Sequence, residues 1–339
     1  MACAKIRFME DNAPIPSREG LQAAPTHETL LARIVVYAVL VAVAYISVSY
    51  AYYVMLGQPM GKVILKIHES VIGGLAQKPI QYRILTYYII EALHRLSGMA
   101  ILRADLVVRF IFTAFALIFF QNYMRRWFDF PASIVGALIV GAILPVTYID
   151  YIHQPHDVPN LLFTIIALGL IRDKKESWLI LLIPIAMLNR ESFIFVLWAW
   201  FFYNYDRLPV KTLILEFAFF GLLSLVVYMA LPYYFGPRPN YVDTVQLANN
   251  LNPLMFRKWL GRLIAFIGPL TVAGCIGFKS KPKFLRRSVG FVIIYMVVNF
   301  VVGMYQETRL FLPVLPVIVP LGLATVFRAN DPDMESERK

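Results

Sequence analysis

The sequence predicts an all-α fold, a polytopic bundle of transmembrane helices, from its composition, its long apolar runs and the placement of its charges. Of the 339 residues, 59% are hydrophobic and 16% are charged, whereas about a quarter of the residues in soluble domains are charged. Several apolar runs reach the length of about 20 residues that crosses a hydrocarbon core as a helix. The net charge of +11 does not indicate nucleic-acid binding. The Lys and Arg residues lie in short connections between apolar runs, where they orient a membrane protein.

Three regions divide the chain. Residues 1–29 are polar and predict a cytosolic N-terminal tail, residues 30–328 predict a single transmembrane domain, and residues 329–339 predict a cytosolic C-terminal tail. The first apolar run, Leu30–Leu56, begins too late and is too long for a cleavable signal sequence, so we expect it to remain as the first span. The two cysteines provide neither a disulfide framework nor a metal-binding spacing.

The segment 57–103 differs from the rest because it is mixed in character and contains two amphipathic stretches. In each stretch the apolar residues fall on one helical face and the charged residues lie off it. Such helices lie in the membrane interface rather than cross it. We therefore expect 57–103 to be an outer loop with interfacial helices.

The remaining apolar runs predict further membrane segments, about ten in total with the first span. They lie at about 104–123, 131–149, 158–171, 177–189, 192–204, 211–235, 259–278, 287–304 and 308–328. Short basic connections and an even number of crossings place both termini in the cytosol. The segment 177–204 is best explained by two half-helices that bend at Asn189–Ser192. Short helices at membrane depth line protein or a water-filled cavity, which predicts a funnel open to the outer side.

Polar residues gather in four clusters on the predicted outer side. These are Gln81, Tyr82 and Arg83 with His68 and Glu69 upstream; Asp150, His153, His156 and Asp157; Asn189, Arg190 and Glu191; and Gln306, Glu307, Thr308 and Arg309. Ionisable residues inside a membrane are costly, so they mark a functional site or pair with one another. Arg190 with Glu191, and Glu307 with Arg309, are open to a purely structural interpretation as ion pairs.

The second cluster also raises the question of a metal ion. His153, His156 and Asp157 are potential ligands, although a histidine in a loop is more often a simple hydrogen-bonding residue. A hard divalent cation such as Mg or Mn, held by Asp157 and by a phosphate of the substrate, is favoured over histidine ligation because such ions prefer carboxylate and phosphate oxygens.

The location of the clusters favours one class of function. A transporter needs charged groups near the bilayer midplane and access from both sides, whereas here the cytosolic side carries only orienting charge. Carboxylates, arginines and amides from four distant parts of the chain converge on one face. This arrangement favours an enzyme that acts on a lipid-anchored substrate at the outer leaflet.

The pattern resembles the GT-C type of integral membrane glycosyltransferases, which take a sugar from a polyprenyl-phosphate carrier. The resemblance covers most of residues 30–328. It consists of the long loop after the first span, the motif from His156 to Phe163 that leads into a short helix, Leu188–Ser192 after a short span, and the closing motif Glu307–Pro313. The family typically places a catalytic Asp early in the first outer loop, and this chain has no Asp between Gly57 and Ala104.

The resemblance implies sugar transfer with inversion from a polyprenyl-phosphate-linked sugar to an acceptor. Asp157 or Glu69 is then expected to act as the base that accepts the proton of the acceptor hydroxyl. The residues expected to bind substrate comprise arginines for the phosphate, carboxylates that orient them or a sugar hydroxyl, and two neighbouring side chains: Arg83, Arg190, Arg309, Glu191, Glu307, His156 and Asn189.

Two alternatives remain open at this stage. The chain is either a flippase or transporter of lipid-linked sugars, or a non-catalytic subunit of a membrane assembly with a relic enzyme fold. The resemblance also implies the location, a bacterial inner (plasma) membrane with the active face outward.

Overall fold

The computed structural model describes residues 29–56, 60–148, 154–241 and 244–330. Within these ranges every regular element is a helix, which confirms the all-α prediction. The first half comprises α1 (Leu30–Leu56), α2 (Met60–Ile72), η2 (Ile80–Tyr82), α3 (Ile84–Ser97), α4 (Ile101–Met124), α5 (Phe130–Ile143), η3 (Leu144–Tyr148) and α6 (Asp157–Arg172). The second half comprises η4 (Glu176–Trp178), α7 (Leu179–Asn189), η5 (Glu191–Phe195), α8 (Val196–Asn204), α9 (Val210–Phe235), α10 (Leu247–Leu251), α11 (Pro253–Cys275), η6 (Phe278–Ser280), α12 (Lys283–Val302), η7 (Thr308–Val314) and α13 (Leu315–Leu323).

Four helical segments are long and apolar enough to cross a membrane by length and composition. They are Leu30–Tyr53, Phe130–Tyr148, Val210–Phe235 and Lys283–Val302, and two shorter apolar segments are Glu176–Asn189 and Thr308–Leu323. These segments indicate a helical membrane protein. The count of about ten membrane segments stays a prediction. Most of the predicted tails, 1–28 and 331–339, lie outside the described residues.

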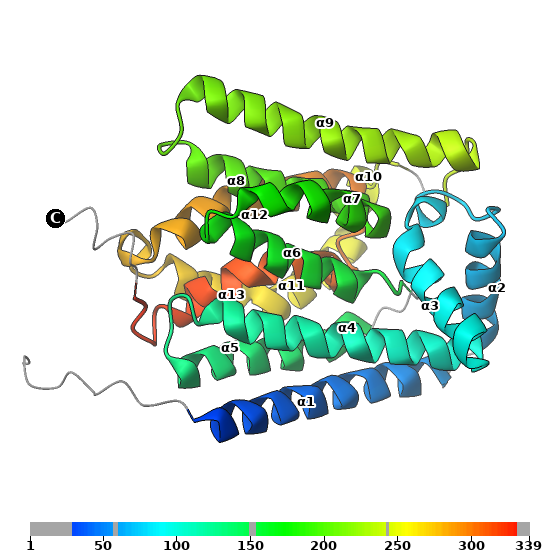
Figure 1. Ribbon diagram of the computed structural model, residues 1–339, viewed down its shortest axis with the longest axis horizontal. Helices are drawn as coiled ribbons and strands as arrows, with labels where there is room; N and C mark the ends of the chain where they lie inside the picture. The colour runs from blue at the N-terminus through cyan, green and yellow to red at the C-terminus, as the bar shows by residue number, and fades with distance from the viewer. Residues whose placement is uncertain (1–28, 57–59, 149–153, 242–243, 331–339) are drawn as a thin grey trace, which may run out of the picture.

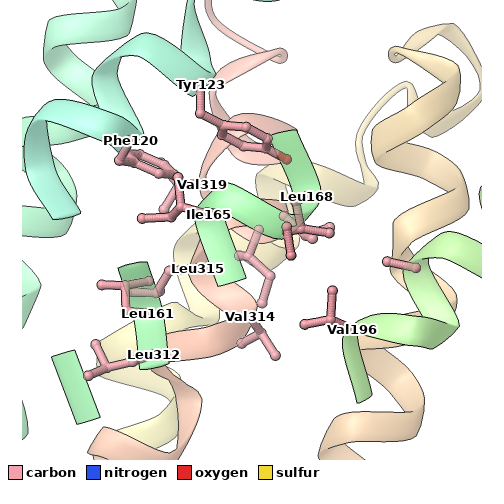
Figure 2. Packing of buried hydrophobic residues seen from close by; sticks show 14 of the residues in the cluster. Phe120, Tyr123, Leu161, Ile165, Leu168, Val196, Leu312, Val314, Leu315 and Val319 are labelled. Carbon is pink, nitrogen blue, oxygen red and sulfur yellow. The ribbon is translucent and has the colours of Figure 1, made fainter. Parts of the chain in front are cut away.

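The long helices run roughly parallel to one another, with α6 and α13 inside the bundle and α1 and α9 on opposite sides of it (Figure 1). The helix α6 packs against α4, α7, α8 and η7. Figure 2 shows the apolar contact between these elements, with Leu161, Ile165 and Leu168 of α6 facing residues of α4, α8 and α13. The first turn of α6 is thereby held at one end of the bundle, where its polar residues meet three other segments.

The two predicted amphipathic stretches form α2 and α3, which lie together across one end of the bundle (Figure 1). The connection between α2 and α3 is attached to the end of α9, because the Tyr82 hydroxyl donates to the Gly236 carbonyl oxygen at 3.0 Å. Gly98 caps the C-terminus of α3, and its φ of 70° places it in the left-handed conformation that glycine adopts readily. This end of the bundle, where α6 begins and α7 terminates, is called the site end below.

Candidate functional site

Asp157 is the first residue of α6 and lies at the centre of the site. Its Oδ1 accepts a hydrogen bond from Nη1 of Arg190, and its Oδ2 accepts one from Nη1 of Arg309 at 3.0 Å. All three side chains are buried. A carboxylate at a helix N-terminus is also favoured by the helix dipole. Both oxygens of Asp157 are therefore engaged by guanidinium groups, and the three residues come from α6, the α7–η5 connection and η7.

Arg309 in turn links Asp157 to Glu307. Its Nη2 donates to Oε2 of Glu307 at 2.6 Å. The segment that carries both residues is fixed from two sides: the Thr308 hydroxyl donates to the Val146 carbonyl oxygen, and the Tyr295 hydroxyl donates to the Leu310 carbonyl oxygen. The position of Arg309 is therefore set by η3 and α12 as well as by its own carboxylate partners.

Arg83 forms the second half of the site. Its Nε donates to Oε2 of Glu191 at 2.8 Å and its Nη2 donates to Oε1, which is the bidentate geometry that suits a carboxylate. Its Nη1 donates to Oε1 of Gln154 and lies 3.1 Å from Nε2 of His156. The loop before α3 is thus joined to the first turn of α6 and to the broken segment between α7 and α8.

The helix α7 ends where the sequence predicts a bend. Asn189 is its last residue, and Arg190 adopts an extended backbone conformation before the short helix η5. The Asn189 amide donates to the His156 carbonyl oxygen at 2.9 Å, and its Oδ1 accepts from the Thr86 hydroxyl at 2.7 Å. Because Arg190 turns towards Asp157, the break in the helix replaces helical continuity with contacts to α3 and α6.

Charge is balanced within this arrangement. We call Arg83, Asp157, Arg190, Glu191, Glu307 and Arg309 the charge cluster, and it contains three cations and three carboxylates. Burial differs across the cluster: the Asp157 side chain is 8% exposed, whereas the Glu191 side chain is 35% exposed. The Arg83 pair therefore forms the outer rim, and Asp157 with its two arginines forms the floor.

Glu69, the alternative candidate for the base, lies apart from the charge cluster. It is exposed on α2, while its neighbour His68 is buried and lies 2.9 Å from Glu91 of α3. The hydrogen bond from His68 lowers the pKa of Glu91, burial opposes this shift, and Arg95 lowers the pKa further. The structure therefore pairs His68 with Glu91 and leaves Glu69 on the exposed side of α2.

The geometry around Asp157 also bears on the predicted divalent cation. Guanidinium groups occupy both of its oxygens, and within the described residues no group of three or more His, Cys, Asp or Glu side chains converges. The predicted partners Asp150 and His153 lie outside the described residues. In the structure two arginines bind the oxygens of Asp157. The divalent cation therefore stays a prediction, and the mechanism proposed for this site uses no metal ion.

Two residues of the site carried no signal in the sequence. Gln154 contacts both Arg83 and His156, and Thr86 binds Asn189. Both are uncharged and occur in ordinary surroundings, so neither the cost of buried charge nor a motif singles them out. By contrast, the seven predicted substrate-binding residues and Asp157 all lie in one connected network.

Comparisons with protein-family models, with curated proteins and with solved structures gave no match for this chain. The functional interpretation therefore rests on the residues and their geometry.

Proposed function

We propose that this protein is a membrane glycosyltransferase that moves a sugar from a polyprenyl-phosphate carrier to an acceptor at the outer face of the membrane, with a GT-C-like arrangement of about ten membrane segments. The observation that carries the proposal is the convergence of Asp157, Arg190 and Arg309, from three separate segments, in one buried network beside two amphipathic helices. Such helices suit a lipid substrate because they lie at the level of its headgroup.

The proposed reaction assigns each group a role. The acceptor hydroxyl attacks the anomeric carbon, its proton passes to Asp157, and the polyprenyl phosphate leaves with the electrons of the broken bond. Arg190 and Arg309 stabilise the leaving phosphate, since the guanidinium fork matches phosphate oxygens. In the structure these arginines bind Asp157 itself. In the proposed mechanism the phosphate takes over their donors on binding, which frees the carboxylate to accept a proton.

The test is transfer from radiolabelled polyprenyl-phosphoryl sugars by the purified protein in lipid nanodiscs. Asp157→Asn keeps the size of the side chain and removes the proton acceptor, so we expect loss of transfer by at least about 100-fold, the usual contribution of a general base. Asp206→Asn, at the other end of the bundle, is the matched control and should keep wild-type transfer. Full activity of Asp157→Asn in a well-folded preparation would contradict the assignment.

A second candidate function is favoured by the balance of charge. Three arginines and three carboxylates neutralise one another without a ligand, as expected for a non-catalytic subunit whose network holds its helices together. Under that alternative, Asp157→Asn lowers the melting temperature and the yield of assembled protein, and the wild-type protein transfers no sugar from any of the lipids offered.

A further inference from the structure

The first turn of α6 contains a buried amide that has no hydrogen-bond partner among the described residues. Asn160 is 1% exposed, and neither its Nδ2 nor its Oδ1 has a hydrogen-bond partner among the described residues. Buried polar groups in folded proteins nearly always have partners, so an orphaned one calls for an explanation. An asparagine side chain offers two donors and an acceptor, and all of these remain available here.

Of the other buried asparagines among the described residues, three bond through both ends of the amide, and Asn299 donates to the Tyr295 carbonyl oxygen. Asn189 bonds through both ends of its amide, as described above. Asn204 donates to the Trp200 carbonyl oxygen and accepts from Arg207. Asn250 donates to two carbonyl oxygens and accepts from the Tyr305 amide. Gln121 lacks a partner at its amide oxygen only, so Asn160 is the one buried amide among the described residues with both ends unpaired.

Helix geometry directs Asn160 towards the charge cluster. Residues three and four apart share one face of a helix, so Asn160 lies below Asp157 and His156, one turn into α6. Side chains on a helix also tilt towards its N-terminus, which here is the site end. Near Asp157, the Nε atoms of Arg190 and Arg309 are likewise buried and have no partner within the described ranges. The charges of the site thus balance one another, while several of its hydrogen-bonding groups lack partners in this part of the chain.

We propose that the Asn160 side chain binds the hydroxyl groups of the sugar that is transferred, which rests on the proposed function and names its sugar-binding residue. A hydroxyl group both donates and accepts, so it satisfies the two ends of the amide as no anion does. The division of labour follows from the chemistry: the arginines bind the phosphate, and the neutral amide one turn deeper binds the sugar. A purely structural network has no use for an unpaired amide at this position.

Two ligands separate the sugar from its carrier in the test. Binding to the full-length protein in nanodiscs is measured for bare polyprenyl phosphate and for polyprenyl phosphate carrying glucose, mannose or galactose. We expect the wild-type protein to bind at least one sugar-bearing lipid more tightly than the bare one. Asn160→Leu should lose about tenfold in affinity for that lipid, the effect of a lost hydrogen bond, with unchanged affinity for the bare carrier.

Stability provides the second measurement. Because Leu has the same branching and number of heavy atoms as Asn and removes an unpaired polar group, Asn160→Leu should keep or raise the melting temperature of the protein without ligand. Asn204→Leu is the matched control and should lower it, since that amide bonds at both ends.

Three results would overturn the proposal. They are equal loss of both affinities in Asn160→Leu, no advantage of any sugar-bearing lipid over the bare carrier in the wild type, or a clear fall in the melting temperature of Asn160→Leu. A wild-type protein that binds none of these lipids would instead refute the proposed function, and this inference with it.

Discussion

The ion pairs of Arg309 with Asp157 and Glu307 and of Arg190 with Asp157, at the site end of the bundle, are buried, whereas those at the opposite end, where α6 terminates, lie partly in solvent. The side chains of Arg309 and Asp157 are 6% and 8% exposed, while those of Arg287 and Asp206 are 36% and 34% exposed. Arg126 with Asp173 belongs to the second kind. Both ends contain arginine, lysine and carboxylates, so composition does not separate them, and burial does.

The difference indicates which charges the fold retains at a cost. Exposed pairs contribute little to stability and are well explained as the basic connections that orient a membrane protein. Buried pairs gain little over apolar residues of the same volume, because desolvation offsets their attraction. The six charged residues of the charge cluster are therefore better explained by function than by stability.

Removing one cation from the charge cluster should have the largest effect on stability. Arg309→Met preserves most of the side-chain volume but leaves Glu307 without its partner and Asp157 with one arginine in place of two. We expect a loss of about 3–5 kcal/mol in the free energy of unfolding, the usual cost of an uncompensated buried charge. Thermal and chemical denaturation in detergent micelles measure it.

The double variant Arg309→Met with Glu307→Leu is the control for that experiment. It restores the balance, with two cations and two carboxylates remaining, so it should recover much of the stability lost in the single variant. The stability of the double variant is compared with the sum of the losses measured for Arg309→Met alone and for Glu307→Leu alone. If the loss in the double variant equals that sum, charge balance is not what stabilises the cluster, and shape alone explains the effect of Arg309→Met.

The sequence predicts the helices of this fold well because each apolar run is long enough to form a helix and is bounded by polar residues. Leu30–Leu56 coincides with α1, and the predicted bend at Asn189–Ser192 lies where α7 ends. Ionisable residues at membrane depth are costly unless they find partners, so the convergence of the four polar clusters on one face can be predicted from the sequence. The number of membrane crossings does not follow from the sequence, because α6 and α8, with 16 and 9 residues, are shorter than a membrane span of about 20 residues.

The pairing within the site is beyond the reach of the sequence. Arg83 binds Glu191, which is 108 residues away, and only the packing of α3 against α7 brings them together. The sequence suggests Glu69 as a candidate base because it is an acid in the first loop. On a helix, however, adjacent residues point about 100° apart. This rotation places His68 inside and Glu69 outside. Asn160 could be found only from its surroundings, because the chain shows the amide and not its lack of partners.

The pair of His68 and Glu91 sharpens the comparison, because it lies at the site end but outside the charge cluster. The pKa of Glu91 is held below its ordinary value of 4.5, first by His68 and further by Arg95, against the effect of burial. A carboxyl group with a lowered pKa stabilises the fold above its ordinary pKa, and this contribution is lost as the pH falls through the lower value of the folded state. Glu91→Gln should therefore be less stable than the wild type by roughly 1.5 kcal/mol above pH 4.5.

The measurement is the difference in unfolding free energy between the wild type and Glu91→Gln across the acid range. The difference should shrink below pH 4.5. A difference that stays constant down to strongly acidic pH would show that the glutamate stabilises α3 through its shape and not through its charge.

The smallest effect is expected at the opposite end of the bundle. Burial raises the pKa of Asp206, but the hydrogen bond to Lys283 and the charge of Arg287 outweigh it and lower the value overall. Since the side chain is 34% exposed, solvent and salt screen these partners, and Asp206→Asn should cost only about 0.2–1 kcal/mol.

Adding 1 M salt should abolish this difference, because the Debye length then falls to about 3 Å, while the loss caused by Arg309→Met should persist in the same salt. Equal sensitivity of both variants to salt would mean that the cluster around Asp157 is as open to solvent as the opposite end, and the contrast between buried and exposed ion pairs would no longer distinguish the two ends.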